Sequence, residues 1–304
     1  MARNRNRACL FSLLQAIILL FIGGLFLGGL SWWRQSITQP RTNVLILGLD
    51  RRPEEGYVVR SDVILLLTVY PPGPRVGAIS IPRDLYVGIP GQGAGRINTA
   101  HFWGEVQGAQ TKTDGGGPAL AMQTVTQNFG VPVHHYVRVD FEGFRAIVDS
   151  VGGIDIVVEE PIVDNAYPTD NYGVTRIEIP AGLQRMDGEM ALRYARSRAR
   201  SSDLDRLGHQ QQIFIALVRR IFDTEVWPDL PTIYQVVMDN VDTDLTFEEI
   251  VLLAPTLYRV GPDDIELHEI GREMADPWIA PTGANVLLPR WDAINPVMQD
   301  LFFP

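Results

Sequence analysis

The chain has a single cysteine, Cys9, among its 304 residues, and this scarcity excludes several kinds of protein. An intrachain disulfide needs two cysteines, so the fold is not one of the small disulfide-stapled scaffolds. Cys9 also lies directly after the basic N-terminus, so the rest of the chain has no thiol for chemistry. Stability must therefore come from a hydrophobic core, and any catalysis must use other side chains.

Motifs of three common protein classes are missing as well. The sequence holds no G-x-S-x-G elbow, and its glycine run at 115–117 lacks the lysine and hydroxyl residue that complete a P-loop. Its five histidines have no zinc-type spacing with cysteine or with a pair of acids. These absences argue against a serine hydrolase, a P-loop nucleotidase and a structural zinc protein.

Positive charge is scarce outside the N-terminal segment. The net charge is −10 at pH 7 although Arg3, Arg5, Arg7 and Arg34 flank residues 8–33, so the remainder is more acidic still. A nucleic-acid-binding domain needs a net basic face to displace counterions from phosphates. We therefore expect no nucleic acid partner.

Residues 8–33 carry no charged side chain. About 20 apolar residues cross a bilayer, and here basic residues precede the run and two tryptophans end it. This pattern predicts one transmembrane helix, with residues 1–7 in the cytoplasm, a linker at 34–42 and the rest of the chain outside the cytoplasmic membrane. A cleaved signal peptide is the alternative, but the run exceeds a usual signal-peptide core and no small-x-small cleavage site precedes Arg34.

Short apolar runs alternate with amphipathic segments after residue 42. Strands buried on both faces are apolar at successive positions, which predicts strands at 43–49, 64–70, 75–81, 133–139 and 154–158. Helical spacing and proline placement predict helices at 118–129, 141–151 and 204–222, a mainly helical stretch at 227–259 and a last helix around 294–302. The alternation favours an α/β sandwich in one domain.

Charged residues stand at the ends of the first three predicted strands. Asp50 follows the first strand, Arg60 and Asp62 stand at the start of the second, and Arg83 closes the third. Polar residues at strand ends are typical of ligand sites in α/β sheets, although each one alone is equally well a turn, cap or surface ion pair. Guanidinium groups fork onto phosphate oxygens, while acids among them neutralise the arginines or hold a divalent cation. The group therefore predicts a site for a phosphorylated ligand.

A second set of arginines lies near the predicted helix at 204–222. If the backbone is extended there, Arg196 and Arg198 face the same side, roughly 6 to 7 Å apart, which suits a pyrophosphate. Arg206 and Gln210 share one helix face near its N-terminus, where the dipole and free N–H groups attract anions. A solvated basic strand edge is the alternative interpretation of the arginine pair.

In these residues the chain resembles the LytR-CpsA-Psr (LCP) family of bacterial cell-envelope proteins. The resemblance covers about residues 43–222, and its motifs occur in the family's order and approximate spacing. They are Gly48-x-Asp50, Arg60-Ser61-Asp62, Ser80-Ile81-Pro82-Arg83-Asp84, Arg96-Ile97-Asn98, Asp149-x-x-Gly152-Gly153, Tyr194-x-Arg196-x-Arg198, Asp205-Arg206 and Gln210-Gln211. Residues 223–304 match less distinctly, and we interpret them as an extension packed on the same domain.

The resemblance implies an α-β-α sandwich with a central mixed sheet, and phosphotransferase activity. LCP proteins resemble enzymes that move a glycopolymer from a polyprenyl-pyrophosphate carrier to a peptidoglycan sugar hydroxyl, forming a phosphodiester with the help of Mg²⁺. By resemblance, Asp50 and Asp62 hold Mg²⁺, Arg83 acts with them in catalysis, and Asp62 also serves as a base. The pyrophosphate-binding residues implied are Arg60, Arg83, Arg96, Arg196, Arg198, Arg206 and Gln210.

Three other functions stay open on the sequence alone. The same residues suit hydrolysis of the pyrophosphate, with water in place of the sugar hydroxyl. A membrane-tethered module that binds polyprenyl phosphate or glycan without turnover is a second alternative. The third is transcription attenuation, against which the acidic and exported domain argues.

Overall fold

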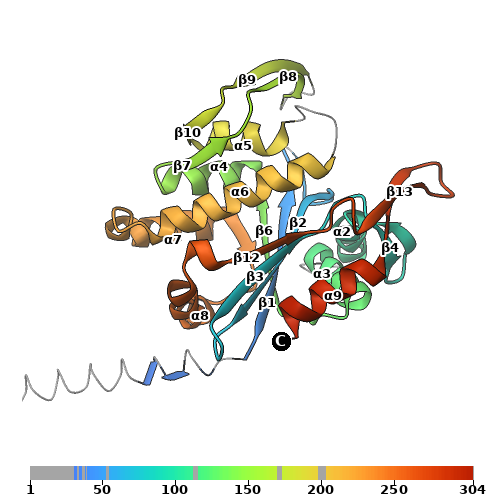
Figure 1. Ribbon diagram of the computed structural model, residues 1–304. Helices are drawn as coiled ribbons and strands as arrows, with labels where there is room; N and C mark the ends of the chain where they lie inside the picture. The colour runs from blue at the N-terminus through green and yellow to red at the C-terminus, as the bar shows by residue number, and fades with distance from the viewer. Residues whose placement is uncertain are drawn as a thin grey trace, which may run out of the picture.

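The computed structural model describes residues 31–32, 34–35, 38, 40–52, 55–111, 116–169, 173–197 and 203–303, without the side chains of residues 111 and 203–206. A six-stranded mixed sheet in the order β11-β6-β1-β2-β3-β12 lies at its centre (Figure 1). The strands are β1 (Thr42–Leu49), β2 (Ser61–Tyr70), β3 (Arg75–Ser80), β6 (His135–Asp140), β11 (Val241–Thr243) and β12 (Glu266–Glu269). β2 runs antiparallel to β1 and β3, whereas β6 is parallel to β1 and β12 is parallel to β3. The predicted mixed sheet is confirmed.

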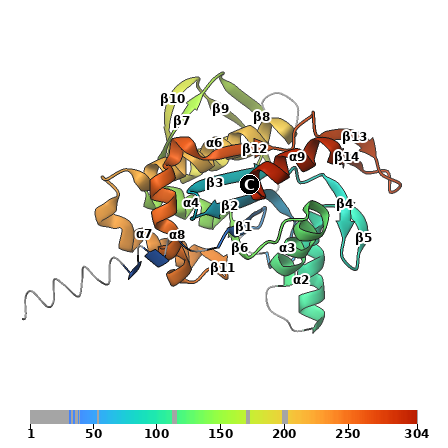
Figure 2. The same cartoon turned by 60° about the horizontal axis from the view of Figure 1, so that its bottom comes forward.

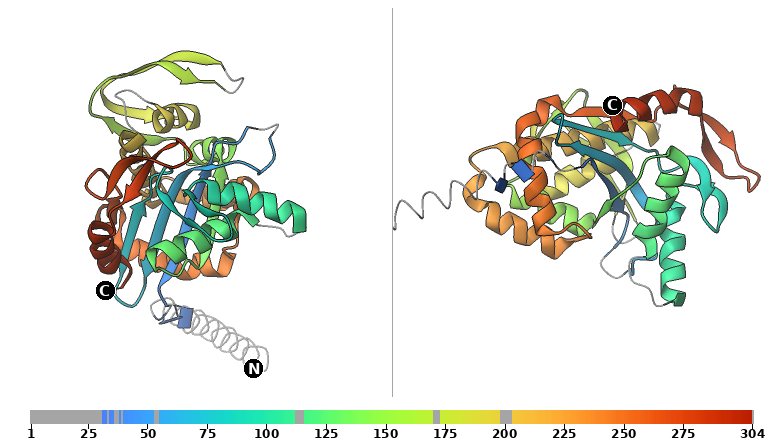
Figure 3. Two further views of the ribbon diagram at one scale, coloured as in Figure 1. Left: turned by 90° about the vertical axis from the view of Figure 1, so that its right-hand side faces the viewer. Right: turned by 90° about the horizontal axis from the view of Figure 1, so that it is seen from below.

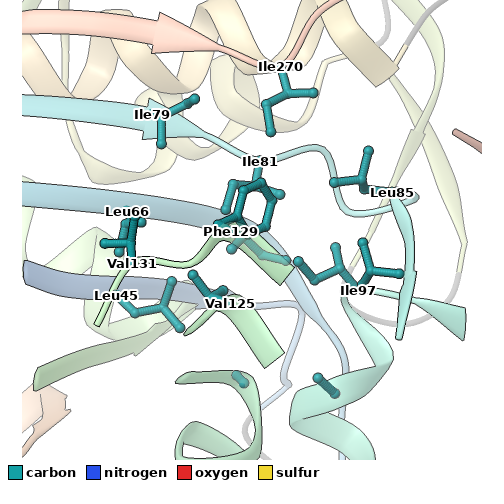
Figure 4. Close-up of a cluster of buried hydrophobic side chains, with 14 of the residues drawn as sticks. Leu45, Leu66, Ile79, Ile81, Leu85, Ile97, Val125, Phe129, Val131 and Ile270 are labelled. Carbon is teal, nitrogen blue, oxygen red and sulfur yellow. The ribbon is translucent and has the colours of Figure 1, made fainter. Parts of the chain in front are cut away.

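Both faces of the central strands are covered, as their continuous apolar runs predicted. Leu45 and Leu66 point to one face, where they join a buried cluster with Val125 and Phe129 (Figure 4). Ile46, one residue along β1, faces the other side. The strand sequences are therefore apolar at successive positions because each face packs against its own layer of helices.

Helices form those two layers, and Figure 2 shows α3 and α6 on opposite sides of β1, β2 and β3. The first layer contains α2 (Thr99–Thr111), α3 (Gly116–Phe129) and α9 (Trp291–Phe302). The second contains α4 (Phe141–Ser150), α5 (Gly188–Arg196), α6 (Asp203–Phe222), α7 (Leu230–Asn240) and α8 (Phe247–Val260). The predicted helices at 118–129, 141–151 and 204–222 thus correspond to α3, α4 and α6.

In the described part of the chain, four two-stranded sheets lie around the sandwich. They are β4 (Tyr86–Ile89) with β5 (Gly93–Arg96), β7 (Ile154–Val158) with β10 (Gly182–Met186), β8 (Ile162–Pro168) with β9 (Val174–Ile179), and β13 (Ala275–Ile279) with β14 (Asn285–Pro289). A second apolar cluster joins β7 and β10 to α4, α5 and α6, and Figure 3 shows these strands as a separate layer at one end of the molecule. They therefore cover the helices, not the central sheet.

Residues after 222 contribute to the central sheet itself. β11 and β12 are its two edge strands, and the two short 3₁₀ helices of this part are η1 (Trp227–Asp229) and η2 (Pro262–Asp264). The expectation of a mainly helical stretch at 227–259 missed β11. Only three residues long, β11 depends on pairing with β6, and so local periodicity could not indicate it.

The predicted transmembrane helix at 8–33 lies almost wholly outside the described residues. Among the helices that the structure does describe, none is both long enough and apolar enough to cross a membrane.

Candidate active site

An apolar cavity of about 340 Å³ lies between the central sheet and the second helix layer. Val137 and Val139 belong to an interior strand but are only partly buried, because they line this cavity. The apolar and small lining residues are Ile46, Gly48, Leu49, Val63, Leu65, Val137, Val139, Phe141, Phe144, Ile147, Pro168, Leu192, Ala195, Ile213, Phe214, Leu217 and Val241. Such a space suits an alkyl chain.

Gly48 keeps part of this space open. A Cβ built at Gly48 would lie 2.8 Å from the Cβ of Val63, so any side chain there would displace Val63, which also lines the cavity. The Gly48-x-Asp50 motif therefore has a packing reason as well as a chemical one.

Charged residues gather at one end of the cavity, beyond the apolar parts of the strands. We call Asp50, Asp62, Arg83, Arg196 and Gln210 the polar end, and all five line the cavity. Three of them meet because β2 runs antiparallel to its neighbours, which brings the end of β1, the start of β2 and the end of β3 to one edge. The sequence predicted this meeting from strand ends alone.

Arg83 and Asp62 form the closest contact at the polar end. The Nη1 of Arg83 donates a hydrogen bond of 2.7 Å to Oδ2 of Asp62, and its Nε lies 3.5 Å from Asp84. Arg96 joins the same network, because its Nε lies 3.1 Å from Asp84 and its Nη2 donates to the carbonyl oxygen of Asn285 at 2.7 Å. Arg96 is therefore linked to Arg83 through one shared carboxylate and does not line the cavity.

Arg196 reaches the polar end from the C-terminus of α5. Its guanidinium lies 4.2 Å from the ring centroid of Phe141, and its Nη2 lies 3.9 Å from Oδ1 of Asp50. The stacking holds the guanidinium plane, while the long distance to Asp50 leaves donors available for an anion. Asp187 begins this helix by accepting a hydrogen bond from the Met190 backbone N–H.

The strand geometry considered for Arg196 and Arg198 does not apply. Arg196 is the last residue of a helix, and the backbone becomes extended only at Ser197. The polar sequence around Asp187 hid this helix from the apolar periodicity. Arg198 lies outside the described residues, as does the side chain of Arg206, whose backbone belongs to α6.

Gln210 comes from α6, and its neighbour fixes that helix to the sheet. Gln211 donates through Nε2 to Oγ of Ser80 at 3.2 Å and to the carbonyl oxygen of His268 at 2.7 Å. Arg60 is exposed just before β2 and is not among the residues that line the cavity. Its contact with pyrophosphate stays a prediction.

Asp140 is a lining residue that the sequence analysis missed. It ends β6, caps α4 by accepting from the Gly143 backbone N–H at 2.9 Å, and accepts from Nε of Arg51 at 2.8 Å. An aspartate directly before a predicted helix is the one signal that pointed to it. Asp140 therefore adds a third carboxylate near the polar end, engaged by a cap and an ion pair.

The electrostatics of the polar end centre on Asp50. Burial raises the pKa of Asp50 above its usual range, the charge of Asp62 adds to that rise, and Arg196 opposes it. The negative charge of Asp62 therefore disfavours the charged form of Asp50. Within the described part of the chain, no cluster of three or more histidine, cysteine or acidic residues forms a ready metal site.

The loop that joins Asp50 to Asp62 is held from the far side of the sheet. His101 is fully buried, and its Nδ1 lies 2.8 Å from the carbonyl oxygen of Val59 while its Nε2 lies 3.2 Å from Nη1 of Arg138. A carbonyl only accepts and a guanidinium only donates, so Nδ1 carries the proton and Nε2 accepts. Burial lowers the pKa of His101, which favours this neutral form.

Arg138 extends that support, which we call the loop brace (His101, Arg138 and Tyr57). Arg138 donates to Oε1 of Glu105 at 2.6 Å and pairs with Asp242, and its guanidinium lies 4.0 Å from the ring centroid of Tyr57. Tyr57 and Val59 belong to the loop, whereas Arg138 comes from β6 and His101 from α2. The loop brace therefore fixes the segment that carries Arg60 and precedes Asp62.

This arrangement suits one class of ligand. An apolar cavity ends in two guanidinium groups, two carboxylates and an amide, so it matches an amphiphile whose head is a phosphate or pyrophosphate. The LytR_cpsA_psr family model matches residues 34–294. The chain belongs to the LytR_cpsA_psr family. The resemblance found in the motifs is confirmed.

Curated members of the LytR_cpsA_psr family show what the chain is similar to. It is 34% identical over 230 residues to the polyisoprenyl-teichoic acid–peptidoglycan teichoic acid transferase TagU of Oceanobacillus iheyensis, which covers 75% of this chain and 66% of that protein. It is 29% identical to TagT of Bacillus subtilis, covering 70% of this chain and 63% of TagT. The chain thus spans just under two thirds of the length of these relatives.

A solved structure of the LytR_cpsA_psr family has the same fold. The crystal structure of Bacillus subtilis TagV superposes with a TM-score of 0.70 at 25% identity, covering 87% of this chain and 98% of that one. This chain therefore shares its α/β fold with a mixed central sheet with TagV.

Proposed function

We propose that this chain transfers a glycopolymer from a polyprenyl-pyrophosphate carrier to a sugar hydroxyl of peptidoglycan. The observation that carries the proposal is the apolar cavity that ends at Arg83, Arg196, Asp50 and Asp62. A polyprenyl tail fits the apolar lining, and the pyrophosphate then meets the two guanidinium groups. The names of the curated relatives TagU and TagT support a teichoic acid as the transferred polymer.

The proposed step is an in-line displacement at phosphorus. The acceptor hydroxyl oxygen forms a bond to the phosphorus that bears the glycan, and the bond from that phosphorus to the bridging oxygen breaks. Polyprenyl phosphate leaves, and the hydroxyl proton passes to a carboxylate. Phosphoryl transfer depends mostly on position and charge stabilisation, so a site of arginines and acids needs no covalent nucleophile.

Each residue of the polar end has a role in this proposal. Arg83 and Arg196 neutralise the pyrophosphate oxygens, and Gln210 donates a hydrogen bond beside them. Asp62, oriented by its 2.7 Å hydrogen bond from Arg83, accepts the hydroxyl proton. Arg60, Arg96, Arg198 and Arg206 add positive charge around the same head group.

Asp50 and Asp62 fit Mg²⁺. This ion binds through one or two carboxylates plus substrate phosphates, and two carboxylates line the polar end. Burial raises the pKa of Asp50, Arg196 opposes that rise and the charge of Asp62 adds to it, so a bound cation would stabilise the charged form of Asp50. When bound, Mg²⁺ would neutralise pyrophosphate charge that the arginines leave uncompensated.

The proposed setting is the outer surface of the cytoplasmic membrane. Residues 8–33 would form the single anchor, with the catalytic domain on the extracytoplasmic side, where both the lipid-linked donor and the peptidoglycan acceptor are found. The anchor would also place the apolar cavity close to the bilayer that supplies the polyprenyl chain.

A transfer assay tests the proposal. The full chain in lipid nanodiscs is mixed with a polyprenyl-pyrophosphate saccharide, peptidoglycan oligomers and Mg²⁺, and the products are separated by mass. We expect phosphodiester-linked product, its loss when EDTA removes Mg²⁺, and its loss in Asp62→Asn. Free phosphorylated saccharide alone would show a pyrophosphatase, and unaltered donor despite tight binding would show a binding module.

The matched control is Arg219→Gln. Arg219 lies on α6 outside the cavity lining and pairs with the exposed Asp263 at 2.9 Å. The Arg219→Gln substitution removes one arginine from the helix that also carries Gln210. Because Arg219 does not line the cavity, the substitution should leave product formation unchanged. Arg83→Gln, by contrast, should lower the rate of product formation about 100-fold.

A further inference from the structure

A small ribbon formed by β4, β5, β13 and β14 adjoins the segment that follows Arg83. β4 pairs with β5 and β13 pairs with β14, and Leu85 joins the two hairpins through a parallel bridge to Leu287. The Leu287 backbone N–H also donates a 3.0 Å hydrogen bond to the carbonyl oxygen of Asp84. Figure 2 shows the four strands together at one side of the molecule, with α7 at the other. The β13–β14 hairpin is therefore fixed to the residues directly after Arg83.

The outer face of this ribbon carries two aromatic rings. Leu85 and Val87 are buried, so Tyr86 between them points to the opposite face of β4. The ring centroids of Tyr86 and Trp278 lie 5.3 Å apart, and the rings meet edge to face at an angle of 64°. Trp278 is still 39% exposed, so the pair leaves aromatic surface open to solvent.

Hydrogen-bonding groups flank the two rings. Arg96 is the cross-strand partner of Tyr86, so both side chains lie on the same face of the ribbon. Asp276 is exposed and stands two residues before Trp278 on β13, which places these two on one face of that strand. We call Tyr86, Trp278, Arg96 and Asp276 the aromatic shelf. Its guanidinium donates hydrogen bonds and its carboxylate accepts them.

A sugar ring is the ligand that presents an apolar face together with a rim of hydroxyl groups. Its C–H groups pack on the negative face of an aromatic ring, and its hydroxyls bond to carboxylate and guanidinium groups. A lipid surface suits the aromatic shelf less well, because contact with it would take the charges of Arg96 and Asp276 out of water. The chemistry of the aromatic shelf therefore fits a saccharide.

We propose that the aromatic shelf binds a sugar of the peptidoglycan acceptor. The inference rests on the proposed function and gives the acceptor a site, which the apolar cavity and the polar end do not. Asp84 carries the argument, because it lies 3.5 Å from Nε of Arg83 and 3.1 Å from Nε of Arg96. One carboxylate thus joins the aromatic shelf to the polar end.

The position of the aromatic shelf distinguishes the acceptor from the donor. None of its residues lines the apolar cavity, so a sugar bound there does not compete with the prenyl chain. In the proposed displacement the leaving polyprenyl phosphate stays with the cavity, and the acceptor hydroxyl approaches the phosphorus from the opposite side. Asp62, the proposed proton acceptor, is bonded to Arg83, which is the residue that a sugar on the aromatic shelf reaches first.

A purely structural role for the aromatic pair predicts a different result. A two-stranded hairpin needs packing against the rest of the domain, and a large aliphatic side chain in place of Trp278 supplies part of that packing. A sugar instead needs an aromatic face. Trp278→Phe should therefore retain saccharide binding, whereas Trp278→Leu should lose it.

The experiment measures acceptor binding directly. The probes are peptidoglycan oligomers, the stem peptide without its sugars, and a polyprenyl-pyrophosphate disaccharide as the donor. Their Kd values are measured by isothermal titration calorimetry with the full chain in detergent micelles, as wild type, Trp278→Phe and Trp278→Leu. The matched control is Trp227→Leu, because Trp227 is 45% exposed and lies in η1, directly before α7.

The proposal predicts a change for the oligomers only. Trp278→Leu should raise their Kd about tenfold and Trp278→Phe less than about twofold, as expected when one aromatic contact is lost or retained. Trp227→Leu should not change it, and every variant should bind the donor with the wild-type Kd. The oligomers should also alter the tryptophan fluorescence of the wild type more than that of Trp278→Phe, a readout that does not depend on the folding of Trp278→Leu.

An unchanged Kd in Trp278→Leu, or no measurable binding of the oligomers to the wild type, would overturn the inference. Equal affinity for the stem peptide and the oligomers would overturn the assignment to a sugar, and a shift confined to the donor would overturn the assignment to the acceptor. Because the readout is binding, it decides the inference even if the chain forms no product. Failure of the transfer assay is therefore distinguishable from failure of this proposal.

Discussion

Arg83 donates a 2.7 Å hydrogen bond to Asp62 across the ends of two neighbouring strands, although both side chains remain partly exposed. A partly exposed ion pair contributes only about 0 to 1 kcal/mol to folding. Because this ion pair contributes so little to the folding free energy, its position at the end of an apolar cavity is better explained by a role in ligand binding.

The first prediction separates activity from stability at this pair. Arg83→Gln should lower kcat/KM for the donor about 100-fold, because one guanidinium that stabilises pyrophosphate charge is lost. Its unfolding free energy should change by less than about 1 kcal/mol. Arg83→Lys keeps the positive charge but not the forked guanidinium, so its kcat/KM should lie between those of the wild type and Arg83→Gln. Steady-state kinetics and urea unfolding measure both quantities, and a loss of stability that matches the loss of activity would contradict this account.

The second prediction concerns the space behind the polar end. Val137→Trp should fill part of the cavity and raise KM for a polyprenyl donor about tenfold or more, since the prenyl chain then lacks room. Overpacking of a filled core costs typically about 1 to 3 kcal/mol, but here the larger side chain enters a cavity and should cost less. Thermal unfolding and donor kinetics test this. A variant with unchanged KM would show that the lipid lies elsewhere. Val157→Trp, at an exposed position on β7, serves as the matched control.

The third prediction follows from the raised pKa of Asp50, whose first cause is burial. A carboxyl with a raised folded-state pKa supports stability at low pH and loses that contribution as the pH rises through the folded pKa. Asp50→Asn should therefore raise the Tm at pH 7, where the wild-type carboxylate is charged, and show no gain near about pH 3, where it is protonated. The same variant should lose transfer activity. Calorimetry without Mg²⁺ at both pH values checks the sign, and a lower Tm at pH 7 would refute it.

The fourth prediction concerns the loop brace. His101→Leu removes the side-chain donor to the carbonyl of Val59 and one of the acceptors of Arg138, at a cost of about 1 to 3 kcal/mol. At assay temperatures well below its Tm, His101→Leu should also have a lower kcat, because the loop before Asp62 is no longer fixed. His101→Asn retains a side-chain N–H close to the position of Nδ1 and should recover much of kcat. If both variants melt earlier yet turn over at the wild-type rate, the loop brace serves the fold alone.

The sequence was most informative where structure is set locally. β1, β2 and β3 are continuous apolar runs, and their polar ends bring Asp50, Asp62 and Arg83 to one edge of the sheet, so both the strands and part of the site could be predicted. Arg196 was predicted as a site residue but not as the end of a helix, because α5 begins among polar residues. The sequence motif identified Arg196 as a site residue, but only the fold shows that its side chain reaches the polar end from the end of α5.

Other parts of the site depend on contacts between distant segments. Asp140 pairs with Arg51, 89 residues away, and His101 contacts Val59 and Arg138, 42 and 37 residues away. Nothing in the local sequence of Asp140 or His101 indicates those partners. β11 and β12 are likewise too short to show a period, and they form strands by pairing with β6 and β3. Whether such short segments form strands therefore depends on tertiary contacts, not on their local sequence.

The most direct test of the account is a crystal structure of the chain with a polyprenyl-pyrophosphate saccharide and Mg²⁺. We expect the prenyl chain to lie against Val137, Val139 and Leu65. The pyrophosphate should lie between Arg83 and Arg196, with Mg²⁺ bound to Asp50 and Asp62. A lipid bound outside the cavity, or a pyrophosphate that contacts neither arginine, would contradict the account.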